Sequence, residues 1–207
     1  MLDQGIITFD TPDFTLRLVK SSQTVASLKP RDAAGFDFTP GDRLAERCGD
    51  GFRHLGDLEF RVRSWTASGA GKWREYSTAA SRAPVAAVPV KEPLLAQADL
   101  GPTLPPDCSL KIYRTWSLEK GRLAMNFMLK NGGSQLIEIG ALAMPMVFNN
   151  VLSDRELDEA HAACSFTDPY IGGDAGYVQV TRLSGQGPAL LVVPGGNDRL
   201  VSTPLEA

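Results

Sequence analysis

The stretch Leu123–Asn150, with the sequence LAMNFMLKNGGSQLIEIGALAMPMVFNN, decides the predicted fold. In its first part every second residue from Leu123 onward is large and apolar, which is the period of a β-strand with one buried face. The Asn-Gly-Gly-Ser segment that follows tolerates positive φ and predicts a chain reversal. Apolar alternation then resumes from Ile137 to Phe148, with an interruption at Gly140. We therefore predict a long β-hairpin with a core face, and from it a β-sandwich.

The same kind of alternation predicts short strands along most of the chain. They are expected at residues 6–9, 14–19, 24–28, 58–63, 73–79, 85–90, 110–118, 178–182 and 189–193. The proline-rich segment Gln97–Asp107 is predicted to be a linker, and the Gly/Asp/Tyr-rich segment Asp168–Tyr177 a loop. One short helix is predicted after Ser153, because Ser153 and Glu156 have the spacing of a capping box.

Length and composition fit one β domain over residues 1–207. The chain is 43% hydrophobic and 22% charged, which is ordinary for a globular protein. A net charge of −3 argues against nucleic-acid binding, which normally needs a basic surface. No apolar run approaches the roughly 20 residues of a membrane-spanning helix. Met1–Gly5 has neither a basic nor an apolar region, so no signal peptide is predicted in this chain and no membrane partner is expected.

The sequence lacks the spacings of common metal and catalytic motifs. Cys48, Cys108 and Cys164 form no C-x-x-C pair, which argues against a zinc site. They are interpreted either as buried free thiols or as one disulfide with an odd thiol. His54 and His161 are not spaced as metal ligands, and the Gly-rich segments lack a phosphate-loop context. We predict no metal, no cofactor and no catalytic residue in this chain.

One charged residue, Arg114, lies on the apolar face of the strand predicted at 110–118. A guanidinium group among apolar residues has to satisfy its hydrogen-bond donors within the protein. We therefore predict that Arg114 is structural and bonds to backbone carbonyls or to a carboxylate.

Two polar segments hold the residue types that sugar-binding sites use. Carboxylates, amides and guanidinium groups bond to sugar hydroxyls, and aromatic rings cover the apolar face of a sugar. The first segment, 31–57, is a long loop whose Phe36, Phe38 and Phe52 argue for order, and the second is 168–177. The predicted carbohydrate contacts are Arg43, His54, Asp57, Asn149, Asp168, Tyr170, Asp174 and Tyr177. The alternative for each aspartate is a turn or capping role.

Three longer segments carry a family resemblance. They are FDFTPGDRLAERCGDGFRHLGDLEFRVR (36–63), IEIGALAMPMVFNN (137–150) and FTDPYIGGDAGYVQVTRLSGQGPALLVVP (166–194). From about Phe9 to its end, the chain resembles an uncharacterised family of fungal and bacterial proteins. In that family an N-terminal β-supersandwich, similar to galactose-mutarotase-like domains, is usually followed by a six-hairpin glycosidase-like (α/α)6 domain. The resemblance implies a mainly β fold, an antiparallel supersandwich with one short helix.

The resemblance also implies a function. The chain would be the accessory sandwich of a glycoside-hydrolase-like protein, shaping or supporting a carbohydrate-binding cleft, while the missing C-terminal (α/α)6 domain supplies the catalytic carboxylates. We therefore expect no hydrolase activity from the isolated chain, and an extracellular location. Three alternatives stay open: a free-standing carbohydrate-binding module, a structural domain whose apolar patch binds the (α/α)6 domain, and the sandwich part of a polysaccharide lyase.

Overall fold

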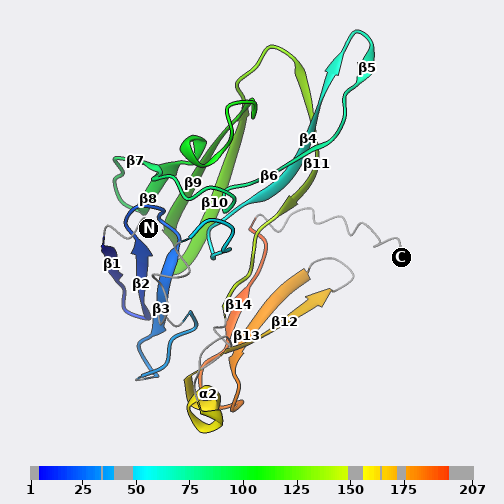
Figure 1. Ribbon diagram of the computed structural model, residues 1–207. Helices are drawn as coiled ribbons and strands as arrows, with labels where there is room; N and C mark the ends of the chain where they lie inside the picture. Colours follow the sequence, from blue (N-terminus) through cyan, green and yellow to red (C-terminus); the bar gives the residue numbers. More distant parts are fainter. Residues whose placement is uncertain are drawn as a thin grey trace. The chain divides into compact units, whose positions relative to one another are not determined.

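The chain folds into two compact units. The structure, a computed structural model, describes residues 5–33, 35–39, 49–148, 156–163, 165–171 and 176–195, and for residue 163 and residues 165–171 it describes the backbone alone. Unit 1 comprises Met1–Phe9, Arg17–Ala26 and Arg43–Val147, and unit 2 comprises Asp10–Leu16, Ser27–Asp42 and Phe148–Ala207. The predicted fold class is confirmed, since the described elements are mainly antiparallel strands with one short α-helix (Figure 1).

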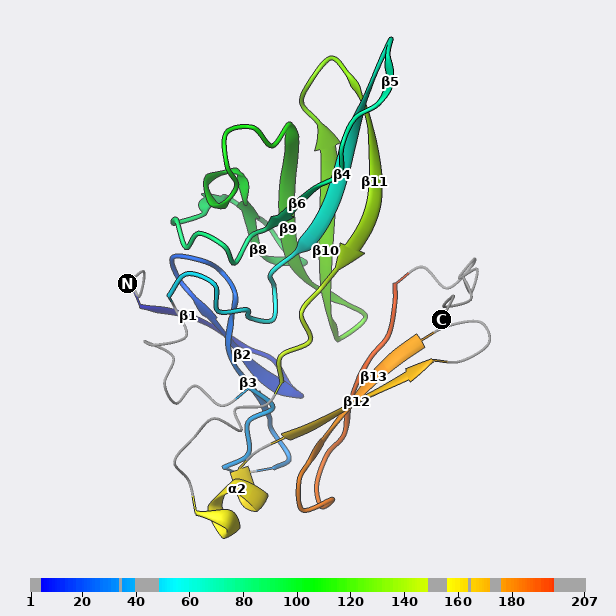
Figure 2. The same cartoon turned by 45° about the vertical axis from the view of Figure 1, so that its right-hand side comes forward.

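Unit 1 is built on two antiparallel sheets. The first has the order β10-β9-β8-β7, with β7 at Ala86–Val88, β8 at Leu94–Asp99, β9 at Leu110–Glu119 and β10 at Arg122–Asn131. The second has the order β11-β4-β5, and β6 also pairs with β4. Its strands are β4 at Glu59–Thr66, β5 at Gly69–Ala70, β6 at Arg74–Ser77 and β11 at Leu136–Ala143. The two sheets form the layers of a sandwich (Figure 2).

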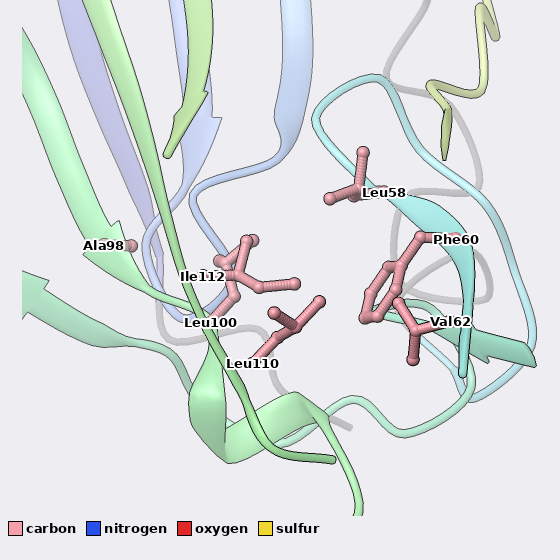
Figure 3. Close-up of a cluster of buried hydrophobic side chains, with 7 residues drawn as sticks. All are labelled: Leu58, Phe60, Val62, Ala98, Leu100, Leu110 and Ile112. Atoms are coloured by element: carbon pink, nitrogen blue, oxygen red, sulfur yellow. The ribbon is translucent and has the colours of Figure 1, made fainter. Parts of the chain in front are cut away.

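The core of unit 1 lies between these layers. In β4 the alternation in the sequence holds, because Phe60 and Val62 are buried whereas Arg61 between them is exposed. Figure 3 shows these side chains opposite those of the other sheet. The cluster consists of Leu58, Phe60, Val62, Ala98, Leu100, Leu110 and Ile112. The inward face of β4 is thus fixed by period-two patterning, which leaves the polar positions of the same strand on the outer face.

The predicted hairpin of Leu123–Asn150 is wrong in its pairing. Strand β10 pairs with β9, and β11 pairs with β4, so the two consecutive strands belong to opposite sheets. The turn between them is held by Asn131, whose side-chain oxygen accepts from the Gly133 amide at 2.9 Å. Gly132 also donates to the Ser109 carbonyl at 2.9 Å. Alternation in a sequence specifies which face of a strand is buried but not which strand lies beside it.

The predicted linker Gln97–Asp107 is also wrong in part. Residues Gln97–Asp99 complete β8, and Gly101–Thr103 form a 3-10 turn, η1. Leu100 between them is 1% exposed and belongs to the core of unit 1. The three prolines follow the strand rather than interrupt it, so proline content alone overestimated the irregular segment.

The N-terminal sheet consists of the three strands predicted near residues 6–9, 14–19 and 24–28. Its order is β1-β2-β3, with β1 at Ile6–Asp10, β2 at Phe14–Val19 and β3 at Val25–Pro30. Its residues are divided between the two units. In unit 1, strand β9 binds the turn between β2 and β3, because the Trp116 indole donates to the Gln23 carbonyl at 3.0 Å.

Unit 2 contains a three-stranded sheet of order β12-β13-β14 and the helix α2. Their bounds are α2 Leu157–Ala163, β12 Ser165–Ile171, β13 Gly176–Arg182 and β14 Leu190–Val192. The helix follows the predicted capping box, of which Ser153 lies outside the described residues. Leu157, the first residue of this helix, is 70% exposed.

The described part of unit 2 also has a buried aromatic cluster. Phe36 and Phe38 are 1% and 4% exposed, and their ring centroids lie 4.9 Å apart. The Asp37 carboxylate between them accepts from the Leu28 amide at 2.9 Å and from the Ser27 hydroxyl at 2.5 Å. These residues give the predicted order to this part of the 31–57 loop, whereas Phe52 in unit 1 is 49% exposed. No helix among the residues described in either unit is long and apolar enough to cross a membrane.

Candidate functional site

Two predicted sugar contacts, His54 and Asp57, are buried in unit 1. Each residue is 1% exposed. The Asp57 carboxylate accepts from the His54 amide at 2.7 Å and from the Thr78 hydroxyl at 3.0 Å. It also pairs with the Arg82 guanidinium, at 2.6 Å and 2.8 Å. Because these donors occupy both carboxylate oxygens, Asp57 has a structural role and does not face an open cleft. This corrects the prediction for both residues.

The charges around Asp57 explain its protonation state. Burial alone raises the pKa of this carboxyl group, but the hydrogen bonds and charge of Arg82, together with the His54 amide, outweigh it and hold the pKa below the ordinary value of 3.8. Asp57 is therefore ionised at neutral pH and compensates the buried Arg82 side chain, which is 5% exposed.

Arg114 completes this cluster and confirms its predicted structural role. It is 1% exposed, and its guanidinium donates to the Gly56 carbonyl and, at 2.5 Å, to the Ser22 carbonyl. Burial lowers the pKa of Arg114 to about 10, against the opposing effect of Asp57. The hollow beside these charges is too narrow to hold a sugar ring. The cluster therefore connects buried loops to β9 through hydrogen bonds and one ion pair.

The other predicted contacts belong to unit 2 or lie outside the described residues. Arg43, Asn149 and Asp174 lie outside them. Asp168 and Tyr170 lie on β12, opposite Gln179 and Tyr177 of β13. The predicted loop Asp168–Tyr177 is thus wrong, because most of it is strand. Tyr177 is 36% exposed. A role of these six residues in carbohydrate binding stays a prediction.

The outer face of the β4–β11–β6 sheet holds a different group of side chains, which the sequence analysis did not single out. We name it the tryptophan–arginine face, and it consists of Arg61, Arg63, Trp65, Trp73, Glu138 and Gly140. Trp65 is 41% exposed and Trp73 half-buried. The guanidinium carbon of Arg63 lies 4.4 Å from the centroid of the Trp73 ring and 5.6 Å from that of Trp65. Arg61 lies 5.0 Å from the Trp73 ring. Aromatic rings and guanidinium planes thus alternate on this surface.

Glu138 fixes the positions of its neighbours on this face. It pairs with Arg63 at 2.8 Å and accepts from the Trp65 indole at 2.9 Å. The hydrogen bonds from Arg63 and Trp65 lower the pKa of Glu138. Since Arg63 and Glu138 are cross-strand partners, the β4–β11 register itself sets this geometry. The rings are held in place before any ligand arrives, which reduces the entropy cost of binding.

Gly140 makes room for Trp73. A Cβ atom at this position would lie 2.5 Å from the Trp73 ring and 3.1 Å from Arg61 Nε. The ring therefore occupies the space that any other residue at this position would fill. A register shift follows Ile139 in the β4–β11 ladder, at the same point. The sequence shows Gly140 as an interruption of a strand, and in the structure the absence of a side chain at this position leaves room for the Trp73 ring.

Substituting Gly140 by alanine is expected to displace the Trp73 ring without unfolding unit 1. The closest atoms belong to a partly exposed side chain that can move, so the loss of stability should stay below about 1 kcal/mol. Near-ultraviolet circular dichroism and acrylamide quenching of tryptophan fluorescence should both change. Gly133→Ala is the matched control, because its added Cβ meets the nearest atom at 3.5 Å. Identical spectra for Gly140→Ala and the unchanged chain would contradict this placement of Trp73.

A signal for this face is present in the sequence. Arg61, Arg63 and Trp65 stand at every second position of β4 and face away from Phe60 and Val62. The strand predicted at 58–63 stops before Trp65, whereas β4 ends at Thr66, so the prediction left Trp65 out of the polar face. The approach of Trp73 depends on pairing between distant segments, which the sequence pattern does not specify. Among the described residues, no group of three or more His, Cys, Asp or Glu side chains is arranged to hold a metal ion.

The fold and the face together describe an antiparallel β-sandwich with a surface of aromatic and basic side chains on one sheet. The chain belongs to a family of unknown function (DUF5695), whose model matches residues 17–207. No protein with a curated description matches the chain.

A solved structure shares the fold. It is that of Polysaccharide Lyase BACCELL_00875, with a TM-score of 0.57 and 14% sequence identity over 89% of this chain. The matched region is 25% of that protein, so the chain spans about a quarter of its length. At this identity the similarity concerns the fold alone.

Proposed function

We propose that this chain is a non-catalytic β-sandwich domain of a carbohydrate-active protein, and that it contacts carbohydrate through the tryptophan–arginine face. The observation that carries the proposal is the set of two partly exposed indole rings, Trp65 and Trp73, fixed by Arg63, Glu138 and Gly140. A sugar ring packs its C–H surface against an aromatic face, and the surrounding guanidinium and carboxylate groups bond to its hydroxyls.

Two further observations support the accessory role. The similarity in fold to part of a polysaccharide lyase relates this sandwich to a protein that acts on polysaccharide. The resemblance of the segments at 36–63, 137–150 and 166–194 to a family with a galactose-mutarotase-like supersandwich points the same way. In this proposal the catalytic carboxylates belong to an (α/α)6 domain of the full protein, whether it is a hydrolase or a lyase. The unit 2 residues Asp168, Tyr170 and Tyr177 are proposed as additional contacts.

Affinity electrophoresis of the whole chain in gels that contain soluble polysaccharides tests the binding. At least one neutral or acidic polymer should retard the chain, with a dissociation constant in the millimolar range or tighter. The same polymers incubated with the chain should yield no new reducing ends and no unsaturated products. Migration unaffected by a broad panel of polymers, together with a silent glycan array, would contradict carbohydrate contact, and measurable turnover would contradict the non-catalytic role.

A second candidate function, a protein-contact surface, is favoured by β11 and the residue that follows it. The exposed apolar side chains there are Leu136, Ile139, Leu142 and Met144, at 71%, 43%, 54% and 44% exposure. Exposed apolar side chains gathered on one element are typical of an interface. Self-association of the chain that Leu142→Ser abolishes, in the absence of glycan binding, would favour this function over the first.

A further inference from the structure

Among the described residues near β4, Arg61 is an arginine without an ion-pair partner. Arg63 pairs with Glu138 at 2.8 Å, Arg74 pairs with Asp107 at 2.7 Å, and Arg53 pairs with Glu59. Arg61 makes no ion pair with any carboxylate among the described residues. Glu75 stands at the paired position on β6, yet no ion pair joins the two side chains. On β11, the residue paired with Arg61 is Ala141. The tryptophan–arginine face therefore carries an exposed positive charge at Arg61.

The Arg61 side chain lies against the Trp73 ring. Its guanidinium carbon lies 5.0 Å from the centroid of the Trp73 ring. A Cβ atom at residue 140 would lie 3.1 Å from Arg61 Nε, so glycine at that position gives room to the arginine as well as to the ring. A guanidinium held beside an aromatic ring presents its remaining N–H donors in a fixed direction. Such a pair suits a ligand with a ring and an anionic group on the same unit.

We propose that the carbohydrate recognised by this face is acidic. A carboxylate or sulfate of the sugar pairs with the Arg61 guanidinium while the ring of the same or the next unit packs on Trp73. This inference rests on the proposed function and adds the class of sugar to it. The whole chain carries a net charge of −3, so non-specific attraction does not account for binding to a polyanion.

The test compares polymers that differ in charge alone. Polygalacturonate is compared with the same polymer after reduction of its carboxylates to alcohols, and dextran sulfate with dextran. The variants are Arg61→Gln and, as matched control, Arg122→Gln, which removes an exposed arginine from β10 in the other sheet. Dissociation constants come from affinity electrophoresis and calorimetry at low and high salt.

The unchanged chain should bind the acidic polymer about 3- to 10-fold more tightly than its neutral counterpart, and added salt should remove the difference. Arg61→Gln should lose this preference and bind the acidic polymer no more tightly than its neutral counterpart, whereas Arg122→Gln should behave as the unchanged chain. A preference for polygalacturonate alone identifies a carboxylate, and one for dextran sulfate alone identifies a sulfate. Equal affinity for acidic and neutral polymers, or equal effects of the two substitutions, overturns the inference. Absence of binding to all four polymers and to the glycan panel overturns the proposed function itself.

Discussion

Replacing Asp57 by alanine is expected to lower the free energy of unfolding of the chain by about 3–5 kcal/mol. The substitution leaves the Arg82 guanidinium, 5% exposed, without its counter-ion, and it removes the acceptor of the Thr78 hydroxyl. Removing one partner of a buried pair is costly because the other charge stays desolvated. Urea unfolding followed by tryptophan fluorescence measures the change.

The matched control for this substitution breaks an exposed ion pair. Asp107 pairs with Arg74, and their side chains are 54% and 61% exposed. Asp107→Ala should cost less than about 1 kcal/mol, because solvent screens such a pair. Similar losses for the two variants would show that burial of the Asp57–Arg82 pair has no special weight in stability.

The same carboxylate makes stability depend on pH in a defined direction. The pKa of Asp57 in the folded chain lies below 3.8, so the unfolded state binds its proton at higher pH than the folded state does. The stabilisation is fully present above that ordinary value and is lost as the pH falls through the folded pKa. Between about pH 7 and about pH 3, Asp57→Asn should lose less of its remaining stability than the unchanged chain. Parallel losses in both proteins would exclude Asp57 as a source of acid sensitivity.

The second large effect concerns the tryptophan–arginine face. Replacing Trp65 and Trp73 together by alanine is expected to weaken carbohydrate binding by about 10- to 100-fold, since aromatic anchors dominate binding energy at most contact surfaces. Either single substitution should account for part of the loss. Calorimetric titration with the polymer that retards the unchanged chain most strongly gives the dissociation constants.

Met128→Ala serves as the control for these substitutions. Met128 is 55% exposed and lies on β10, in the other sheet of unit 1. The Met128→Ala variant should bind the polymer as the unchanged chain does. The urea midpoints of all variants show whether each remains folded. Full affinity in the folded double variant would move the contact away from this face and towards the predicted unit 2 residues.

Local sequence patterns predict which side chains are buried, whereas the pairing of distant strands is not encoded in any one segment. Burial of Phe60 and Val62, and the bonding of Arg114 to backbone carbonyls, follow from local pattern and from the need to satisfy a buried guanidinium. The partner of β11 could not be predicted, because the alternation in Leu136–Ala143 fits any neighbouring strand with the same face.

The residues of the candidate site could also be predicted only in part, because their burial and pairing depend on distant segments. Glycine, aspartate and tyrosine made residues 168–177 look like a loop, although β12 and β13 take up most of the segment. His54 and Asp57 have side chains of the types that bind sugars, but both are buried, and Asp57 bonds to groups within the protein. Trp73 reaches Arg63 and Gly140 through the pairing of β6 and β11 with β4, which no single segment encodes.

The crossing from β10 to β11 also bounds the smallest fragment that can carry the face. Arg63 and Glu138 are 75 positions apart along the chain, and the pairing between them forms only when β11 lies beside β4. A protein shortened after Asn131 would retain Trp65 and Trp73 yet lose β11, the strand that orients them. High sequence separation of this kind also slows folding. Any minimal module derived from this chain must therefore extend at least through Ala143.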